Sequence, residues 1–434
     1  MKLLRVIYNL LFPLVLVIML PGFLLRMVRR GNYRHKFGQR FGIYSRRVKE
    51  KLAGRQWTWV HAVSVGEVMI ALKLISAMRK EWPDLHVVLS TTTSTGYRMA
   101  HRHRSAQFEP VYHPLDVPWV VSRAFAVVRP ERLVLVEAEI WPNVMAAAKK
   151  AGIPAVLVNA RLSSRSERRY LFVKPLASAL FNQLDALCIQ DPSDRKRWEG
   201  LGVGPEKIRL TGSIKFDREE KPAGKPARDF RPVLAEIGVR AGMPVILGGS
   251  TFDGEEDMLA GIVRDLRKET PGLFLILVPR HAERGREVLR KLEAAGHRAI
   301  LRQGGGSEGP IDILIVNTTG ELRDWYACAD VVFIGKSLAA NARGGQNPAE
   351  ALEAGCPVLF GPNMQNFGVL ARQLVLEGGA IQVSDPAGLR DELRRLLADP
   401  EKRRDMVSRG TACLAVHDGA TRRTVELLAS LDNP

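Results

Sequence analysis

Cysteine is scarce in this sequence, and the scarcity excludes two ways of stabilising a fold. The 434 residues include four cysteines, each standing alone in an apolar segment without a Cys-x-x-Cys pair. Disulfide frameworks and cysteine-based zinc sites both require cysteines at paired spacings. The sequence therefore predicts free thiols, a reducing cytosolic environment and no metal site.

Two common nucleotide-binding signatures are also missing. The stretch GGGSEG at 304–309 has the letters of a G-x-G-x-x-G fingerprint, but Pro310 and a predicted strand follow it where a helix is required. The stretch GKS at 335–337 follows a predicted strand, as a P-loop does, yet Asp330 occupies the position of the first P-loop glycine. Neither a dinucleotide fingerprint nor a P-loop is therefore expected.

Acidic residues are nearly absent from the first sixty positions. Residues 1–60 hold thirteen lysines and arginines against the single Glu50, a net charge of +12. Of the total of +18, this leaves +6 (18 minus 12) for all the other positions. A nucleic-acid-binding domain carries its positive charge on a folded face or along a helix. Because the excess here is confined to one end of the chain, we expect no nucleic-acid partner.

An uncharged apolar run lies inside this basic region. Residues 6–25 (VIYNLLFPLVLVIMLPGFLL) form a stretch that would be about 30 Å long as a helix, enough to cross a bilayer. The cations that follow it are Arg26, Arg29, Arg30, Arg34 and Lys36. By the positive-inside rule, these cations keep the rest of the chain on the cytoplasmic side.

The run has no small-residue cleavage site, which favours an uncleaved anchor over a signal peptide. Asn9, Pro13 and Pro21 interrupt it, so two arrangements stay open: a single-pass helix, or a helix lying in the interface with the basic residues on anionic phospholipid. In both cases the protein is expected to work at a membrane surface with its remaining domains in the cytoplasm.

Apolar runs alternate with helical patterns along the rest of the chain. Near-continuous runs of valine, isoleucine and leucine followed by helices are typical of parallel, doubly wound sheets. The pattern restarts after a segment rich in charge, proline and glycine. The sequence therefore predicts an α/β protein with two Rossmann-like domains facing across a cleft and an N-terminal membrane-anchoring helix. The expected divisions are an anchor and basic segment at 1–50, an N-terminal domain at 51–218, a linker at 219–231, a C-terminal domain at 232–415, and a C-terminal helix at 416–434 that is a candidate to pack back on the N-terminal domain.

Polar side chains follow the predicted strands in both halves. Ligands of open α/β sheets bind beyond the carboxyl ends of the strands. Basic and hydroxyl groups beside helix starts suit an anionic ligand. The first half offers Glu67, Glu137, Glu139 and Lys215, and the second offers Ser250, Thr251, Pro279, Arg280, His281, Thr319, Gly320, Glu321, Asn347, Pro348, Ala349 and Glu350.

Two of these carboxylates have a purely structural explanation. Ser64 and Glu67 have the spacing of a capping box. Asn347, Pro348 and Glu350 have the spacing of N-cap, N1 and N3 residues of a helix. On spacing alone, capping is the favoured role for both glutamates.

Helix position also bears on the chemistry of these acids. A carboxylate in the first turn of a helix has its pKa lowered, which weakens it as a base, so we expect closure of the domains to expel water and raise the pKa of Glu67. Glu137 and Glu139 are less ordinary, because strand alternation places both on one face, where like charges raise one pKa.

Six stretches, taken in chain order, resemble one family. They are HAVSVGE (61–67), EAEIWPN (137–143), NARLSSRS (159–166), TGSIKFD (211–217), LVPRH (277–281) and GGQNPAEALEAGCPVLFGP (344–362). Together they resemble the 3-deoxy-D-manno-octulosonic acid (Kdo) transferases over nearly the whole chain. The resemblance implies a GT-B glycosyltransferase fold, CMP-Kdo as donor, no cofactor, and a lipid A precursor (lipid IVA) as acceptor at the cytoplasmic face of the inner membrane, in lipopolysaccharide biosynthesis.

The resemblance also implies roles for individual residues. Glu67 would be the general base that deprotonates the acceptor hydroxyl. Lys215 and either Glu137 or Glu139, with Glu137 the choice, would stabilise the transition state of an inverting, direct displacement without an obligate metal. The residues expected to bind the donor are Ser250, Thr251, Pro279, Arg280, His281, Thr319, Gly320, Glu321, Gly335, Ser337, Asn347, Pro348, Ala349 and Glu350.

Three positions depart from the family's pattern: Phe252 stands in place of a histidine, Lys336 in place of a glycine, and Gln346 in place of a histidine. They leave the reaction class unchanged and bear on the geometry around the CMP phosphate. Two other functions stay open: a membrane-associated GT-B transferase that uses a UDP-sugar, and a non-catalytic, membrane-tethered nucleotide-binding module.

Overall fold

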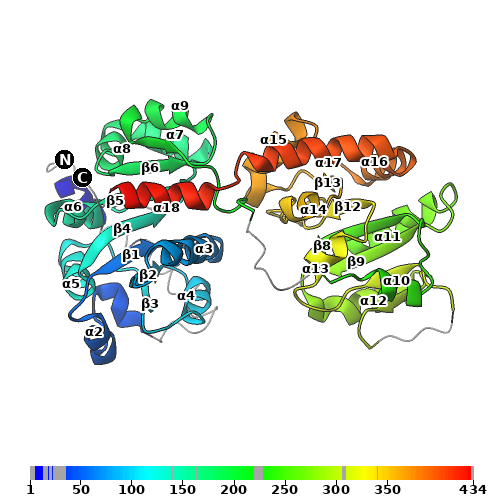
Figure 1. Ribbon diagram of the computed structural model, residues 1–434, viewed down its shortest axis with the longest axis horizontal. Helices are drawn as coiled ribbons and strands as arrows, with labels where there is room; N and C mark the ends of the chain where they lie inside the picture. Colours follow the sequence, from blue (N-terminus) through cyan, green and yellow to red (C-terminus); the bar gives the residue numbers. More distant parts are fainter. Residues whose placement is uncertain are drawn as a thin grey trace. The chain divides into compact units, whose positions relative to one another are not determined.

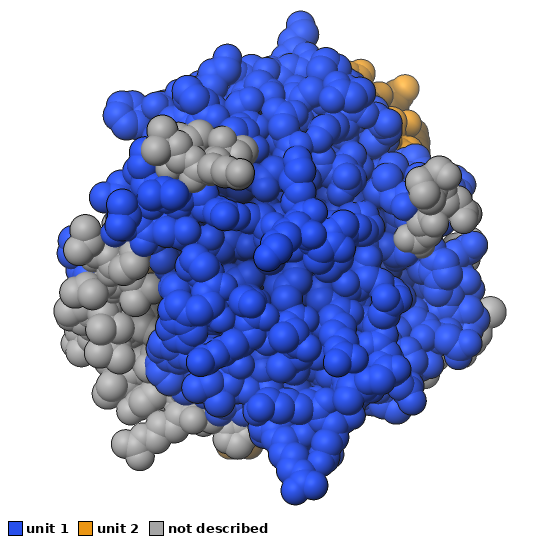
Figure 2. All heavy atoms as spheres, turned by 90° about the vertical axis from the view of Figure 1, so that its left-hand side faces the viewer, with its two compact units in different colours: residues 1–218, 417–434 blue, residues 219–416 orange. Residues whose placement is uncertain are grey.

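The chain forms two compact units, which Figure 2 distinguishes by colour. Unit 1 comprises Met1–Arg218 and His417–Pro434, and unit 2 comprises Glu219–Val416. The computed structural model describes residues 5–12, 18, 22, 36–138, 140–162, 164–218, 228–304, 309–339 and 341–431. Each unit is described by itself.

Unit 1 is built on a seven-stranded parallel sheet in the order β3-β2-β1-β4-β5-β6-β7. The strands are β1 (Trp57–His61), β2 (Val87–Thr91), β3 (Phe108–Tyr112), β4 (Pro130–Val136), β5 (Ala155–Ala160), β6 (Ala186–Ile189) and β7 (Ile208–Leu210). Most of them are buried along their whole length, which is why they read as unbroken apolar runs rather than alternating ones.

Helices cover both faces of this sheet (Figure 1). They are η1 (Phe37–Phe41), α2 (Arg46–Leu52), α3 (Val65–Glu81), α4 (Ser94–His101), α5 (Pro118–Val128), α6 (Pro142–Lys150), α7 (Ser164–Phe172), α8 (Lys174–Phe181), α9 (Asp194–Gly200), η2 (Pro205–Lys207) and α18 (Ala420–Ser430). Buried residues of α2, α5, α6, α8 and α9 form one core cluster with the strands, and those of α3, α4 and α18 form the other.

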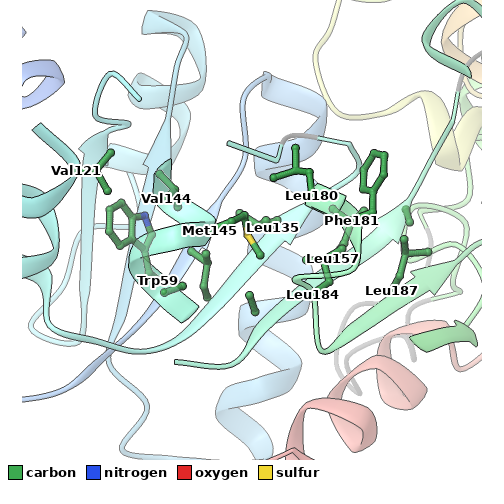
Figure 3. Packing of buried hydrophobic residues seen from close by; sticks show 14 of the residues in the cluster. Trp59, Val121, Leu135, Val144, Met145, Leu157, Leu180, Phe181, Leu184 and Leu187 are labelled. Carbon is green, nitrogen blue, oxygen red and sulfur yellow. The ribbon is translucent and has the colours of Figure 1, made fainter. Parts of the chain in front are cut away.

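The first of these clusters supports the centre of the sheet. Leu135 on β4, Leu157 on β5 and Leu187 on β6 pack beside Val144, Met145, Leu180 and Phe181 of the covering helices, as Figure 3 shows. Burying each such side chain contributes roughly 1.5–3 kcal/mol. This close-packed core therefore fixes the positions of the strand ends.

The last helix of the chain belongs to unit 1. α18 packs on α3, and Val425 and Leu428 enter the core cluster of that face. The Asp217 carboxylate accepts hydrogen bonds from the Gly419 and Thr421 N–H groups at 2.8 and 2.7 Å. This cap fixes the start of α18 to the segment that follows β7.

Unit 2 is a second seven-stranded parallel sheet, in the order β10-β11-β9-β8-β12-β13-β14. The strands are β8 (Val245–Thr251), β9 (Phe274–Pro279), β10 (Ala299–Leu301), β11 (Ile313–Ile315), β12 (Val331–Ile334), β13 (Val358–Phe360) and β14 (Ile381–Gln382). The helices are α10 (Arg231–Glu236), α11 (Glu255–Leu266), η3 (Ala282–Arg284), α12 (Gly285–Ala294), α13 (Leu322–Tyr326), α14 (Ala349–Glu353), η4 (Gln365–Phe367), α15 (Gly368–Leu376), α16 (Pro386–Ala398) and α17 (Pro400–Ala415). The predicted pair of α/β domains with parallel sheets is confirmed.

Most of the apolar run at 6–25 lies outside the described residues. Residues 5–12 are helical, and none of the helices that the structure describes is long and apolar enough to cross a membrane. One side of this short helix contacts α6 and the residue before it: the Asn143 Nδ2 donates to Asn9 Oδ1 at 2.7 Å, and the Phe12 ring meets Trp141 edge-on. Val6, Ile7, Leu10 and Leu11 are exposed.

Candidate active site

Glu67 lies in the first turn of α3, at the carboxyl end of β1. Ser64 is the N-cap, and its Oγ accepts from the Glu67 N–H at 3.3 Å, so the predicted capping by serine is confirmed. The carboxylate reaches back to the start of the helix, as the capping box predicts: one oxygen accepts from the Val63 N–H at 2.8 Å and the other from the Ser64 hydroxyl at 2.9 Å. These hydrogen bonds fix the orientation of the carboxylate, and the residue stays half-buried.

Burial raises the pKa of Glu67 above that of an ordinary glutamate, and the hydrogen bonds from Val63 and Ser64 offset only part of this rise. The bonds at the helix start lower the pKa of Glu67, as expected for a first helical turn, but desolvation outweighs them and the net shift is upward. A carboxylate with a raised pKa is a better proton acceptor.

Glu137 follows β4 directly and has a left-handed backbone with φ 66°. Such a conformation is uncommon for residues other than glycine and is typical of functional sites. Burial raises its pKa, the negative charge of Glu67 raises it further, and the cations Arg161 and Lys215 oppose both. The two glutamates are therefore close enough to influence one another. Glu139 lies outside the described residues.

Lys215 completes this group in unit 1. Burial lowers its pKa to about 8, with the Arg161 cation adding to the shift and the Glu137 carboxylate opposing it. The structure thus brings together three of the predicted catalytic residues, Glu67, Glu137 and Lys215. A carboxylate with raised pKa beside a desolvated cation can accept a proton and stabilise developing negative charge.

Asn159 positions the segment that carries Lys215, and the sequence analysis did not assign it a role. It is fully buried near the end of β5 with a left-handed φ of 53°. Its Oδ1 accepts from the Ile214 N–H at 2.9 Å and from the Ser213 hydroxyl at 3.4 Å. A signal was present in the sequence, because an asparagine ending an apolar strand tolerates the left-handed conformation and offers a side-chain acceptor.

In unit 2, predicted donor-binding residues gather at the ends of β8 and β12. Ser250 is buried with a left-handed φ of 55°, and the Thr251 hydroxyl donates to Glu256 at 3.1 Å. Gly335 packs so tightly that an added Cβ would lie 2.5 Å from the Ser250 carbonyl oxygen. The Ser337 hydroxyl accepts from the Gly361 N–H at 2.8 Å. These backbone contacts bind the two strand ends into one surface.

The loop before α14 reaches the same surface, because the Gly345 N–H donates to the Lys336 carbonyl at 3.1 Å. α14 begins at Ala349 with Pro348 as its N-cap, one residue later than the predicted cap. Asn347 nevertheless makes a capping bond, because its Oδ1 accepts from the Ala349 N–H at 3.1 Å, and its Nδ2 donates to Glu350 at 3.0 Å. The pair holds the half-buried Glu350 carboxylate in a fixed orientation.

The remaining residues that were predicted to bind the donor follow β9 or lie at the start of α13, and most of them are exposed. Arg280 and His281 follow β9 and are exposed, whereas Pro279 is buried. Glu321 caps α13 and already accepts from Thr318 and Trp325, with Arg228 also in contact. Thr319 and Gly320 are exposed beside it. α13 contacts α14, and an Arg323–Glu353 ion pair of 2.7 Å links them.

Comparison with known proteins gives one consistent result. Residues 35–218 match a family model described as 3-deoxy-D-manno-octulosonic-acid transferase (kdotransferase). A Bordetella pertussis 3-deoxy-D-manno-octulosonic acid transferase is 36% identical over 399 residues, covering 90% of each chain. The Haemophilus influenzae enzyme of the same name is 31% identical over 408 residues, covering 92% of each. Among solved structures, Anabaena HepE in complex with UDP superposes with a TM-score of 0.54 at 14% identity, over 87% of this chain and all of that one, a similarity of fold alone.

Proposed function

Since the chain belongs to the 3-deoxy-D-manno-octulosonic acid transferase family and is a glycosyltransferase, we propose that it moves Kdo from CMP-Kdo to a lipid A precursor in lipopolysaccharide biosynthesis. The observation that carries this proposal beyond the family is the grouping of Glu67, Glu137 and Lys215 at one edge of unit 1. A sugar hydroxyl is a weak nucleophile, and this group contains the base that such a nucleophile requires.

Glu67 acts as the general base. As the acceptor hydroxyl oxygen attacks the anomeric carbon of Kdo, its proton passes to the Glu67 carboxylate, and the bond between that carbon and the CMP phosphate breaks with inversion. General-base catalysis of this kind is worth roughly 10² to 10⁴ in rate. The raised pKa of Glu67 and its fixed hydrogen bonds to Val63 and Ser64 support this assignment.

Lys215 supplies positive charge near the reacting groups, and Glu137 holds it in place. A lysine with a pKa of about 8 is still mostly protonated at neutral pH, and its partial desolvation strengthens its attraction for an anionic transition state. The opposite signs with which Glu137 and Lys215 shift one another's pKa support a direct electrostatic contact.

Unit 2 binds the nucleotide. The ordered Asn347–Glu350 pair offers a carboxylate for ribose hydroxyls, and the exposed Arg280 offers a cation for phosphate. The tight joining of the β8 and β12 ends at Gly335 supports a backbone surface close to the ligand. The carboxyl ends of parallel strands are where α/β domains hold nucleotides.

The N-terminal segment places the enzyme at the cytoplasmic face of the inner membrane, as a single-pass or interfacial anchor. The support lies in the two sides of the helix at 5–12: one contacts α6 and the residue before it through Asn9 and Phe12, and the other exposes Val6, Leu10 and Leu11. Exposed apolar side chains beside a basic region suit an anionic lipid surface.

The test is a transfer assay in detergent with the purified full chain and a lipid A precursor. CMP-Kdo is offered in one series and UDP-sugars in another, and the lipid products are resolved by mass. Addition of Kdo from CMP-Kdo alone is the expected result. Transfer from a UDP-sugar would assign a different donor, and nucleotide binding without any transfer would contradict the enzymatic proposal.

A further inference from the structure

A buried carboxylate accepts hydrogen bonds from a set of backbone N–H groups just after the end of β12. Glu255, which is completely buried, is the first residue of α11. Its Oε1 accepts from the N–H groups of Ser337, Leu338 and Ala339 at 2.9, 3.1 and 3.4 Å. Its Oε2 accepts from Phe252 at 2.9 Å and from Lys336 at 2.6 Å.

Consecutive N–H groups that converge in this way form a cradle that binds anions in many phosphate sites. Here the side chain of Glu255 occupies the cradle, so its N–H groups are already paired. An anionic ligand at this edge of the sheet therefore needs another source of positive charge. One such positive charge lies on the turn whose backbone Glu255 binds.

The turn presents Lys336. This residue has a left-handed backbone with φ 57°, a conformation that costs a residue other than glycine on the order of 1–2 kcal/mol. Its N–H is bound by Glu255 and its carbonyl accepts from Gly345, so the backbone is fixed on both sides. Gly335 before it packs against Ser250 and Thr251. Lys336 thus lies between the end of β8 and the loop that leads to Asn347.

The Lys336 side chain is half-buried, and its ammonium lies over the Phe252 ring, 5.6 Å from the centroid. Within the described part of the chain, this ammonium makes neither an ion pair nor a hydrogen bond. Two other cations of unit 2 differ, because Arg284 pairs with Glu256, and Lys291 with Asp253 and Glu287. Among these three cations, Lys336 is the one whose charge is not matched by a carboxylate.

We propose that Lys336 binds an anionic oxygen of the nucleotide-activated donor, with Glu255 as the positioning residue and Phe252 as the surface on which the ammonium rests. The inference rests on the function proposed above. The anionic oxygen can belong to the phosphate or to the carboxylate of the sugar, and both have the chemistry that an ammonium recognises.

The test uses the full chain with Lys336→Gly, which removes the ammonium and leaves a residue that adopts the left-handed turn without strain. Binding of cytidine, CMP and CMP-Kdo is measured by calorimetry, together with the melting temperature. Loss of one charge-assisted contact is expected to weaken CMP binding about tenfold or more. Cytidine affinity and melting temperature should not fall. A loss seen with CMP-Kdo but not with CMP would assign the contact to the sugar carboxylate.

Lys291→Ala is the matched control, because it removes a lysine of the same region whose charge is already neutralised. Its affinities should equal those of the wild type. Equal binding of CMP and CMP-Kdo by Lys336→Gly and wild type would overturn the inference alone. Failure of the wild type to bind CMP would instead contradict the proposed function, and the inference with it.

Discussion

The two units carry a glutamate at the same topological place, the first turn of the helix that follows their first strand, and they use it in opposite ways. In unit 1, Glu67 on α3 is half-buried and accepts from one backbone N–H and one hydroxyl. In unit 2, Glu255 on α11 is completely buried and accepts from five backbone N–H groups. The Glu255 carboxylate is thus used to hold the fold, whereas the half-buried Glu67 carboxylate can still contact a ligand.

Residues with left-handed backbone conformations also occur at strand ends in both units. Of the six residues other than glycine with positive φ in the described chain, four lie at or just after strand ends, namely Glu137, Asn159, Ser250 and Lys336. Two belong to each unit. In unit 1 Glu137 is coupled to the predicted base and Asn159 holds the segment of Lys215, and in unit 2 both residues lie among the predicted donor-binding positions. Strain of roughly 1–3 kcal/mol at each is tolerated because the close-packed strands below fix the chain.

The largest effect is expected from Glu67→Gln. Loss of the base should reduce transfer by roughly 10² to 10⁴, while CMP affinity and melting temperature change little. The measurements are single-turnover transfer, calorimetry and thermal unfolding. Glu81→Gln, at the exposed far end of the same helix, is the control and should keep full activity. Retained activity with a stability loss of about 1 kcal/mol would make Glu67 a cap only.

Glu255→Ala should show the opposite pattern. Removing this carboxylate leaves five N–H groups of a buried turn without their acceptor, so we expect the unfolding free energy of unit 2 to fall by at least about 3 kcal/mol. The denaturation midpoint measures this loss. Glu353→Ala, which removes the partner of Arg323 on a neighbouring helix, should cost much less because the Arg323 side chain of that pair is 53% exposed. A variant as stable as the wild type would abolish the contrast between the two glutamates.

The sequence predicted the architecture well, because long buried strands leave unbroken apolar runs that few other folds require. The resemblance to the family implied roles for Glu67, Glu137 and Lys215, and these roles stay predictions, although the three residues influence one another's pKa in the structure. The sequence did not predict that Glu255 is completely buried and accepts five backbone hydrogen bonds, whereas Glu67 is half-buried. Glu67 and Glu255 look alike in the chain, and four of the five donors of Glu255 come from residues more than eighty positions away. Asn159 was missed for the same reason, because its partners at 213 and 214 are distant in sequence.

Asn159→Ala sharpens the comparison within unit 1. The variant removes the acceptor for the Ile214 N–H and the Ser213 hydroxyl, so the segment carrying Lys215 should lose its fixed position. We expect a loss of about 2 kcal/mol in unfolding free energy and a fall in kcat of about tenfold with little change in donor KM. Asn182→Ala, which removes an amide that bonds the Gly202 carbonyl away from the group, should affect stability without this change in kcat.

The smallest effects concern the pH profile of transfer. Activity should rise as Glu67 loses its proton, and it should fall as pH passes about 8, where Lys215 becomes neutral. The negative charge of Glu67 raises the pKa of Glu137. A charge–charge interaction acts on both partners, so we expect the Glu137 carboxylate to raise the pKa of Glu67. Glu137→Gln should therefore shift the acid limb to lower pH. Lys215→Arg should move the alkaline limb upward, since a guanidinium stays protonated. Profiles of kcat/KM for the three proteins decide this, and an acid limb that is unchanged in Glu137→Gln would mean that the two carboxylates titrate independently.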